Sequence, residues 1–99
     1  HGCTIGDRCL IGINATIMDG AQIGDNSIVA GHAIVSENSV FPPNSIIAGA
    51  PAKVIKTRDN GAANAVNAAF YSRNARNYAA GIHRLNEQDL IDVGLIAPK

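Results

Sequence analysis

Apolar residues recur at every sixth position through the first half of the chain. The series has no gap and runs Ile5, Ile11, Ile17, Ile23, Val29, Val35, Phe41 and Ile47. A second series, two residues earlier in each hexad, contains only small residues: Cys3, Cys9, Ala15, Ala21, Ser27, Ala33, Ser39 and Ser45. A third series lies three residues later: Arg8, Asn14, Gly20, Asn26, His32, Asn38, Asn44 and Ala50. Most of its members are Asn or Gly, which adopt left-handed backbone angles at the lowest cost.

This six-residue period predicts a β-solenoid of hexapeptide repeats, in which three hexads make one triangular coil of 18 residues. Each face supplies a short parallel strand, stacked about 4.8 Å from the strand of the next coil. Side chains alternate along a strand, so the residue before each inward apolar one faces outward. The expected outward columns are Leu10, Ile28 and Ile46; Thr16 and Ile34; and Thr4, Gln22 and Val40. The first column is apolar, so a neighbouring subunit or the chain's own C-terminal helix should cover it.

The repeat ends in a proline-containing region, because proline removes a donor from the strand ladder. The prolines are Pro42, Pro43 and Pro51. Residues 53–56 are predicted to form a last strand or an exit segment, and residues 59–61 a turn that caps a helix. From about residue 62 to residue 85 the apolar spacing becomes helical, and the apolar tail 90–96 is expected to dock. The predicted packing face of this helix is Ala68, Tyr71, Ala75, Tyr78, Ile82 and Leu85.

The predicted organisation is a single domain with two parts. Residues 1–57 form the hexapeptide-repeat β-helix, and residues 58–99 form the C-terminal helix and docking tail of the same domain. The chain begins inside a hexad, so we expect the β-helix to be incomplete at its N-terminus, with further coils before His1.

Composition narrows the choice of partners. The net charge is zero, with residues 1–52 carrying −3 and residues 53–99 carrying +3. Basic residues form no patch and aromatic residues are few, so nucleic-acid binding is not expected. The sequence contains no apolar run of membrane-spanning length and no visible signal peptide, so we expect no membrane association and a cytoplasmic protein. Cys3 and Cys9 should lie on different faces, which argues against a disulfide and favours buried small-residue positions.

Several strings resemble the γ-class carbonic anhydrase-like proteins. They are the opening His1-Gly2-Cys3-Thr4-Ile5-Gly6-Asp7, the segment Ile23-Gly24-Asp25-Asn26-Ser27, the closing Ile47-Ala48-Gly49-Ala50-Pro51-Ala52-Lys53-Val54 and the helical Phe70-Tyr71-Ser72-Arg73-Asn74-Ala75-Arg76-Asn77-Tyr78. The resemblance implies a left-handed parallel β-helix followed by a C-terminal α-helix, assembled as a homotrimer. It also implies a zinc ion, or iron or cobalt, held at each subunit interface by three histidines. The substrate would be carbon dioxide or bicarbonate, interconverted by metal-bound hydroxide.

The resemblance assigns roles to two residues. His1 matches the last of the three metal-binding histidines, and the other two would lie upstream of this chain. Tyr71 aligns with a helix tyrosine near the metal, where its phenol could hydrogen-bond bicarbonate as a catalytic residue. Each has a plainer interpretation, an ordinary surface histidine for His1 and a packing side chain for Tyr71.

Other candidates have structural interpretations beside the chemical ones. Asp19 and Glu37 follow His1 by one and two coils, so Asp19 could orient its imidazole, or both could be solvated turn acids. His32 belongs to the left-handed turn series and is interpreted as a turn residue rather than as a general base. The remaining aromatic and histidine positions of the helix, Phe70, Tyr78 and His83, are assigned no chemistry.

Three functions are consistent with the sequence. The first is a γ-carbonic anhydrase-like protein whose metal site is incomplete in this chain, which leaves its status as an enzyme open. The second is a hexapeptide acyltransferase that binds an acyl-CoA in a groove between subunits, although the unbroken repeat offers no loop for a catalytic base. The third is a non-catalytic trimeric scaffold.

Overall fold

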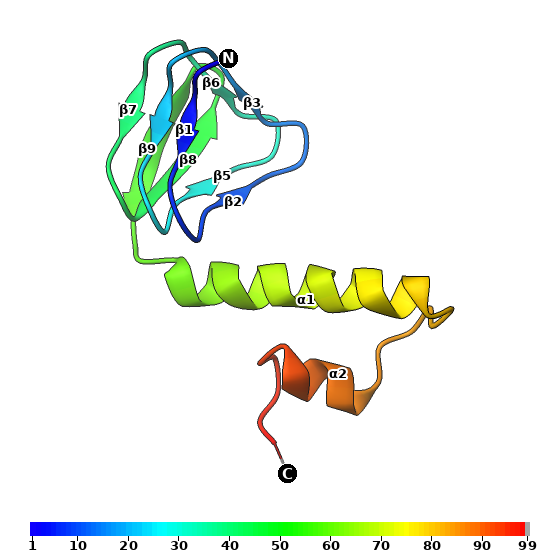
Figure 1. Cartoon of the computed structure of the whole chain (residues 1–99). Helices are drawn as coiled ribbons and strands as arrows, with labels where there is room; N and C mark the ends of the chain where they lie inside the picture. The colour runs from blue at the N-terminus through cyan, green and yellow to red at the C-terminus, as the bar shows by residue number, and fades with distance from the viewer. Residues whose placement is uncertain (99) are drawn as a thin grey trace. The chain divides into compact units, whose positions relative to one another are not determined.

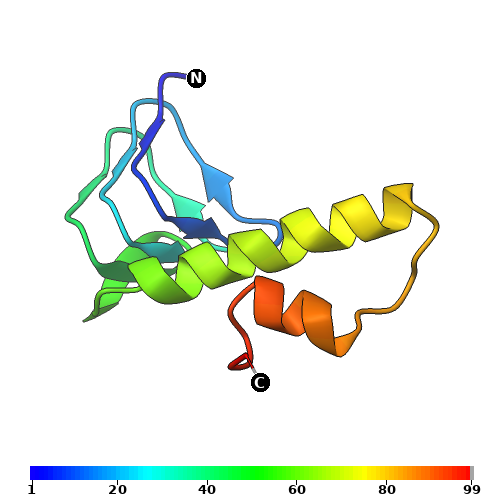
Figure 2. The ribbon, with the colours of Figure 1, turned by 60° about the horizontal axis from the view of Figure 1, so that its bottom comes forward.

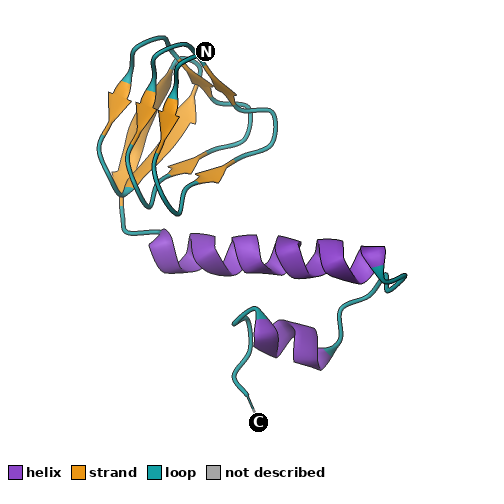
Figure 3. Ribbon diagram, viewed as in Figure 1, coloured by secondary structure: helices purple, strands orange, loops and turns teal. Residues whose placement is uncertain are grey.

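The computed structural model describes residues 1–98 and contains two compact units. The first spans His1–Asn64 and contains all the strands; the second begins at Ala65 and is helical. Figure 1 shows the chain of the first unit winding through three faces, and Figure 3 shows the short strands joined by tight turns. The division falls inside the long helix, so the proposal that residues 58–99 share one domain with the repeats stays a prediction.

The first unit contains three parallel sheets whose strands are separated by one coil. The repeat strands are β1 Thr4–Ile5, β2 Leu10–Ile11, β3 Thr16–Ile17, β4 Gln22–Ile23, β5 Ile28–Val29, β6 Ile34–Val35, β7 Val40–Phe41 and β8 Ser45–Gly49. They pair in the orders β1-β4-β7, β2-β5-β8 and β3-β6. The paired residues are those of the predicted outward columns: Thr4, Gln22 and Val40; Leu10, Ile28 and Ile46; Thr16 and Ile34. These sheets fit the predicted left-handed β-helix, while the hand of the coil itself stays a prediction.

The core lies inside the coils, where the predicted inward and small series meet. Six residues form it: Ala21, Ile23, Val29, Ala33, Val35 and Ile47. Burial is incomplete in the first described coil, where Ile5 is 44% and Ile11 is 39% exposed because residues 1–98 supply a stacked coil on one side of it only. Each inward residue is thus buried mainly by the coil next to it.

The turn series adopts the backbone that its residue types predict. Positive φ angles occur at Arg8, Asn14, Gly20, Asn26, His32, Asn38 and Asn44. The prediction is wrong only for the last member, Ala50, which precedes Pro51 in a cis peptide bond. Gly49 takes the positive φ, +98°, in its place, because glycine has no Cβ to oppose that conformation.

The repeat is closed at its C-terminal end by an antiparallel strand. Strand β9 (Ala52–Thr57) pairs with β8 and carries a register shift opposite Ile46 and Ile47. This confirms the predicted last strand. Strand β9 is the edge strand of a four-stranded sheet in the order β2-β5-β8-β9. It carries two lysines, Lys53 and Lys56, which discourage edge-to-edge pairing with another chain.

Helix α1 (Gly61–Ala79) begins where the turn was predicted and ends earlier than predicted. The Asp59 carboxylate accepts the backbone N–H of Gly61 at 2.9 Å and so caps the first turn. The predicted end at Leu85 is wrong because Gly81 has φ +78° and the Ile82 N–H donates to the Asn77 carbonyl, 2.7 Å away. This geometry is the glycine-containing Schellman termination of a helix.

The larger members of the predicted packing face are exposed in the described chain, so the packing of this face on the repeat of its own or a neighbouring subunit stays a prediction. Tyr71 is 61%, Tyr78 is 53% and Ile82 is 47% exposed. The buried or half-buried residues of α1 in the second unit are Val66, Ala69, Phe70, Arg73, Asn74 and Asn77, with polar members among them. None of the helices in residues 1–98 is long and apolar enough to cross a bilayer.

A second helix, α2 (Glu87–Asp92), was not predicted as a helix. Figures 1 and 2 both show it running beside α1. Asn86 and Asp89 form a reciprocal capping box, in which each side chain accepts the backbone N–H of the other residue. Gly94, with φ +87°, ends the helix. The docking expected of the tail 90–96 is therefore achieved by a short helix and a glycine turn.

Candidate functional site

His1 lies at a coil corner, above Asp19 in the next coil. The backbone N–H of Gly20 donates to the His1 carbonyl at 3.1 Å, which confirms the predicted stacking of the two coils at this corner. The Asp19 carboxylate binds the terminal amine of His1, not its imidazole. The expected orientation of the His1 imidazole by Asp19 is therefore not observed.

The same arrangement recurs at the next corner. The Asp25 carboxylate accepts the backbone N–H of Asp7, 18 residues earlier, at 2.7 Å. Aspartates at this hexad position thus bind the backbone nitrogen one coil away. We therefore interpret Asp19 and Asp25 as coil-stacking residues, a role that neither of the two sequence-based interpretations contained.

The ligands for a complete metal site are not assembled within the part of the chain that the structure describes. No three His, Cys, Asp or Glu side chains of residues 1–98 gather closely enough to hold a metal ion. Protein zinc sites use three or four such ligands. The residues present in one chain therefore do not fit a zinc, iron or cobalt site by themselves. His1 as a metal ligand stays a prediction that requires ligands from elsewhere.

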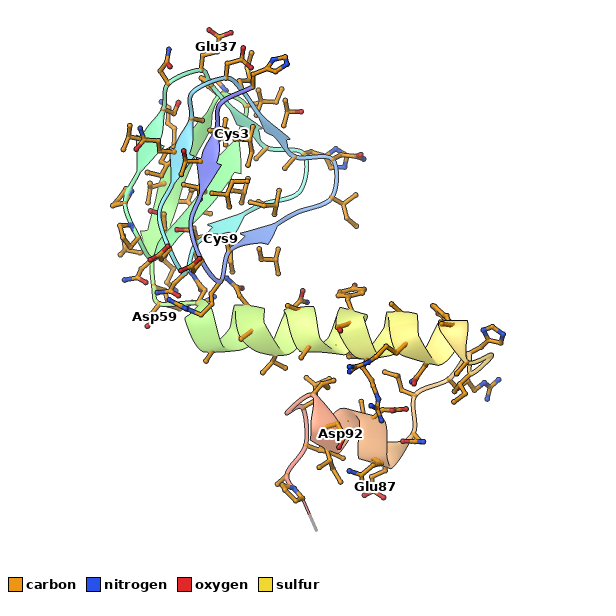
Figure 4. The ribbon with its side chains drawn as sticks, in the orientation of Figure 1. Cys3, Cys9, Glu37, Asp59, Glu87 and Asp92 are labelled. Atoms are coloured by element: carbon orange, nitrogen blue, oxygen red, sulfur yellow. The ribbon has the colours of Figure 1, made fainter. Side chains whose placement is uncertain are left out.

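Both cysteines are free and lie at different corners of the coil, just before β1 and β2 (Figure 4). The Cys9 thiol is half-buried and lies 3.3 Å from the Gly24 carbonyl oxygen, as a small interior residue would. Cys3 is exposed, which contradicts the expected burial. The reason is its position in the first coil, where the inward side is also uncovered.

His32 occupies a turn and not a protruding loop. Its φ is +60° and its backbone N–H donates to the Ile13 carbonyl at 2.9 Å. The strands before and after it, β5 and β6, keep the six-residue spacing of the repeat. The interpretation of His32 as a turn residue is consistent with this geometry, and residues 1–47 contain no inserted loop that could carry a general base.

Tyr71 is on α1 in the second unit and is exposed. Its ring makes an edge-on contact with Phe70, at a centroid distance of 5.4 Å and an interplanar angle of 83°. The packing interpretation of Tyr71 is thus not supported by the described residues. Its role as a catalytic residue stays a prediction. Tyr78 contacts the ring of His83 at 5.5 Å, also at an exposed position.

The sequence analysis did not identify Asp89, a buried carboxylate that accepts several hydrogen bonds. Asp89 is 3% exposed and receives Nε of Arg73 at 2.6 Å, and this contact lowers the pKa of the carboxyl. The same hydrogen bond raises the pKa of Arg73, which also contacts Asp92 at 3.0 Å. The Asn-x-x-Asp spacing from Asn86 to Asp89, a capping-box pattern, could have indicated a helix start here.

Two buried asparagines at the start of α1 were also missed. Asn60 donates its side-chain N–H groups to the carbonyls of Asn26 and Arg58, at 3.0 and 2.7 Å. Asn64 donates to the carbonyls of Arg8 and Ser27, at 2.8 and 3.1 Å. These bonds hold the first helical turn on the coil corner, so both residues are structural.

Comparison with known proteins identifies the repeat. Residues 2–37 match the model of the bacterial transferase hexapeptide family, described as six repeats. The comparison with curated proteins gave no match. A hexapeptide transferase family protein from Anaplasma phagocytophilum has a similar fold, with a TM-score of 0.73 at 24% identity over 79% of this chain and 48% of that chain.

Two further solved structures are more similar in sequence. A Bacillus cereus protein assigned as an acetyltransferase is 40% identical over 59% of this chain and 34% of its own, with a TM-score of 0.57. A hexapeptide-repeat acetyltransferase from Vibrio cholerae, solved with acetyl coenzyme A, is 33% identical over 56% of this chain and 29% of its own, with a TM-score of 0.52. The chain thus spans between 29% and 48% of the length of these structures. Its repeat region is similar to hexapeptide-repeat transferases, and the γ-carbonic anhydrase-like subclass is not confirmed.

Proposed function

We propose that this chain is part of a hexapeptide-repeat acyltransferase that uses an acyl-CoA donor. The observation that carries the proposal is the likeness of the repeat to acetyltransferases at 33 to 40% identity, one of them solved with acetyl coenzyme A. This corrects the order of the sequence-based hypotheses, in which carbonic anhydrase came first.

In this proposal an outer face of the coils forms one side of the acyl-CoA binding groove. The apolar column Leu10, Ile28 and Ile46 faces outward and is only half-buried in the described chain. We propose that it lies at an interface in a homotrimer, beside the groove that receives the acyl-CoA. An acceptor nitrogen or oxygen attacks the thioester carbonyl, the carbon–sulfur bond breaks, and the acceptor's proton passes to a base while the CoA thiolate leaves.

The general base for that step is not identified in this chain, because His32 is a turn residue of the repeat. In the proposal, the base comes from a residue outside the described structure or from another subunit. The contribution of residues 1–57 is then binding and orientation rather than proton transfer.

Ligand-induced stabilisation tests the proposal directly. The melting temperature of the protein is measured with acetyl-CoA, with free CoA and with inorganic phosphate at the same ionic strength. Saturating acetyl-CoA at a hundred times its Kd should stabilise by about 2.7 kcal/mol. Ile28→Thr in the apolar column should weaken the effect, while Gln22→Thr on another face serves as the matched control. A melting temperature unmoved by acetyl-CoA contradicts the proposal.

The γ-carbonic anhydrase-like function is the second candidate, and one observation favours it. The repeat runs without an inserted loop, which leaves an acyltransferase without an evident base in residues 1–47. His1 is at an exposed corner, where a ligand shared with another subunit would have to be. Because the described residues do not complete a metal site, they do not by themselves support a hydration step.

Metal content separates the two candidates. Zinc, iron and cobalt are measured per chain in untagged protein, before and after incubation with each metal, and His1→Ala is compared with His83→Ala. Stoichiometric metal that is lost only in His1→Ala supports the second candidate. If neither acetyl-CoA nor metal binds, a stable trimer by light scattering indicates a scaffold, and a monomer contradicts all three hypotheses.

A further inference from the structure

The second unit contains one side chain that joins its two helices. Asp89 of α2 is 3% exposed. Its Oδ1 accepts Nε of Arg73, and its Oδ2 accepts Nδ2 of Asn77 at 3.1 Å and the backbone N–H of Asn86 at 3.1 Å. Two of these three donors belong to α1. A single carboxylate therefore links the helices and also caps one of them.

Apolar burial contributes little to this attachment. Within residues 65–98, Val93 is the only apolar side chain that is fully buried, with 7% exposure. Leu90 and Ile91 are half-buried, whereas Leu95 and Ile96 are 51% and 38% exposed. A helix of six residues is also too short to be stable in water by itself. The polar contacts of Asp89 must therefore supply much of the attachment.

Helices α1 and α2 are separate elements, each with its own end signals, joined by an exposed connection. Helix α1 ends in its own glycine termination at Gly81, and α2 begins at its own cap at Asn86. Residues 80–84 between them are exposed. The far end of the segment lies against the first half of α1, where a Cβ added at Gly94 would lie 3.7 Å from Cγ2 of Val66. Removing the segment would therefore leave every backbone hydrogen bond of α1 in place and uncover its Val66 side.

We infer that residues 86–96 form a latch: a segment held on α1 by Asp89 that can detach while α1 and the repeat stay folded. The closed latch covers the side of α1 that carries Val66 and the Arg73 guanidinium. The open latch presents an apolar and basic helix face. Release of the latch requires that the Asp89 carboxylate lose its hydrogen bonds to Arg73 and Asn77 of α1.

Hydrogen exchange of the full chain tests the inference, with the backbone amides of residues 87–95 as the readout. Asp89→Asn is nearly isosteric, but it removes the charge and turns an N–H group toward the donors of Arg73 and Asn77. Loss of charge-assisted hydrogen bonds should reduce protection of the latch about 10- to 100-fold. Protection of the amides of Ile23, Val29 and Ile47 should not change.

Two further variants show whether the contact itself is responsible. Arg73→Gln should also reduce latch protection, but by less than Asp89→Asn, which weakens the hydrogen bonds from Asn77 and Asn86 as well. The double variant should lose no more than Asp89→Asn alone, because the Arg73 contact is already absent in that variant. Asp7→Asn, an identical change at an exposed position of the first unit, is the matched control and should leave the latch protected. Asp92→Asn should have a smaller effect, since Asp92 is 38% exposed.

Three outcomes would overturn the inference. The first is unchanged protection of residues 87–95 in Asp89→Asn, which would mean that another contact holds the segment. The second is loss of protection that spreads to Ile23, Val29 and Ile47, which would mean that the latch and the repeat unfold together. The third is an unprotected latch in the unmodified chain.

Discussion

The coils and the helical unit of this chain are stabilised by the burial of different kinds of side chain. In the coils most buried positions are apolar, with Val29, Val35 and Ile47 all fully buried, and the buried polar side chains are the small Ser27 and Ser45. In the helical unit the buried positions include a carboxylate and an amide, Asp89 and Asn77, beside the single apolar residue Val93. Burial of hydrocarbon is non-directional, whereas a buried carboxylate requires specific donors. The coils should thus tolerate changes of charge and the helical unit should not.

The largest effect is expected from a cavity in the coils. Ile47→Ala should reduce the free energy of unfolding by about 2–5 kcal/mol, because it removes a fully buried side chain from the stacked series. The measurement is urea unfolding with the denaturant slope checked for constancy. Ile5→Ala is the matched control: its side chain is 44% exposed, so it should cost about 1 kcal/mol or less. Equal losses at both positions would contradict the view that stacking buries these residues.

A smaller effect is expected from the turns. Asn14 has φ +60° and an exposed side chain. Asn14→Val places a β-branched residue in a left-handed conformation and should cost about 1–2 kcal/mol. Asn14→Gly should cost much less, since glycine adopts this conformation freely. Unfolding measurements that gave Val and Gly the same stability would show that turn conformation does not limit the coils.

The coils could be predicted from the sequence because equivalent positions of each hexad have the same structural environment. Leu10, Ile28 and Ile46 face the same surroundings three times, so their alignment in one column follows from counting. The exception, Ala50, comes where the repeat stops and Gly49 with Pro51 sets the turn. Repetition therefore determined the register and the turn angles, while single events at the end of the repeat had to be observed.

The helical unit could not be predicted in the same way, because its apolar spacing continues past its real end. Ile82 and Leu85 fit the helical period of α1, yet Gly81 ends the helix before them. The tyrosines follow the predicted face but are exposed, since the contacts that hold the unit involve Arg73 and Asp89. A hydrophobic pattern contains no information about a buried ion pair.

For the candidate site, the sequence predicts which residues stack in one column but not which of their atoms bind each other. The column His1 and Asp19 is confirmed, because it follows from the 18-residue coil. Which atom of His1 binds Asp19 depends on backbone geometry that the spacing does not fix. The functions of His1 and Tyr71 depend on residues beyond this chain or on the placement of its two units, so both stay predictions.

The smallest expected effect is that of pH on latch protection, and only the helical unit should respond to it. The Arg73 guanidinium on α1, with the N–H of Asn86, lowers the pKa of Asp89 below its ordinary value of 3.8, and Asp92 is the other charged group in contact with Arg73. A carboxyl whose pKa is lower in the folded state stabilises at pH values above its unfolded pKa. That contribution is lost as the pH falls through the lower folded pKa. Latch protection should therefore be constant from about pH 8 to pH 5 and decline only below about pH 4. Nuclear magnetic resonance of the amides of residues 87–95 can follow this, with Val29 and Val35 as apolar references that should not respond. Release of the latch near neutral pH would mean that Asp89 is not the charged group that holds it.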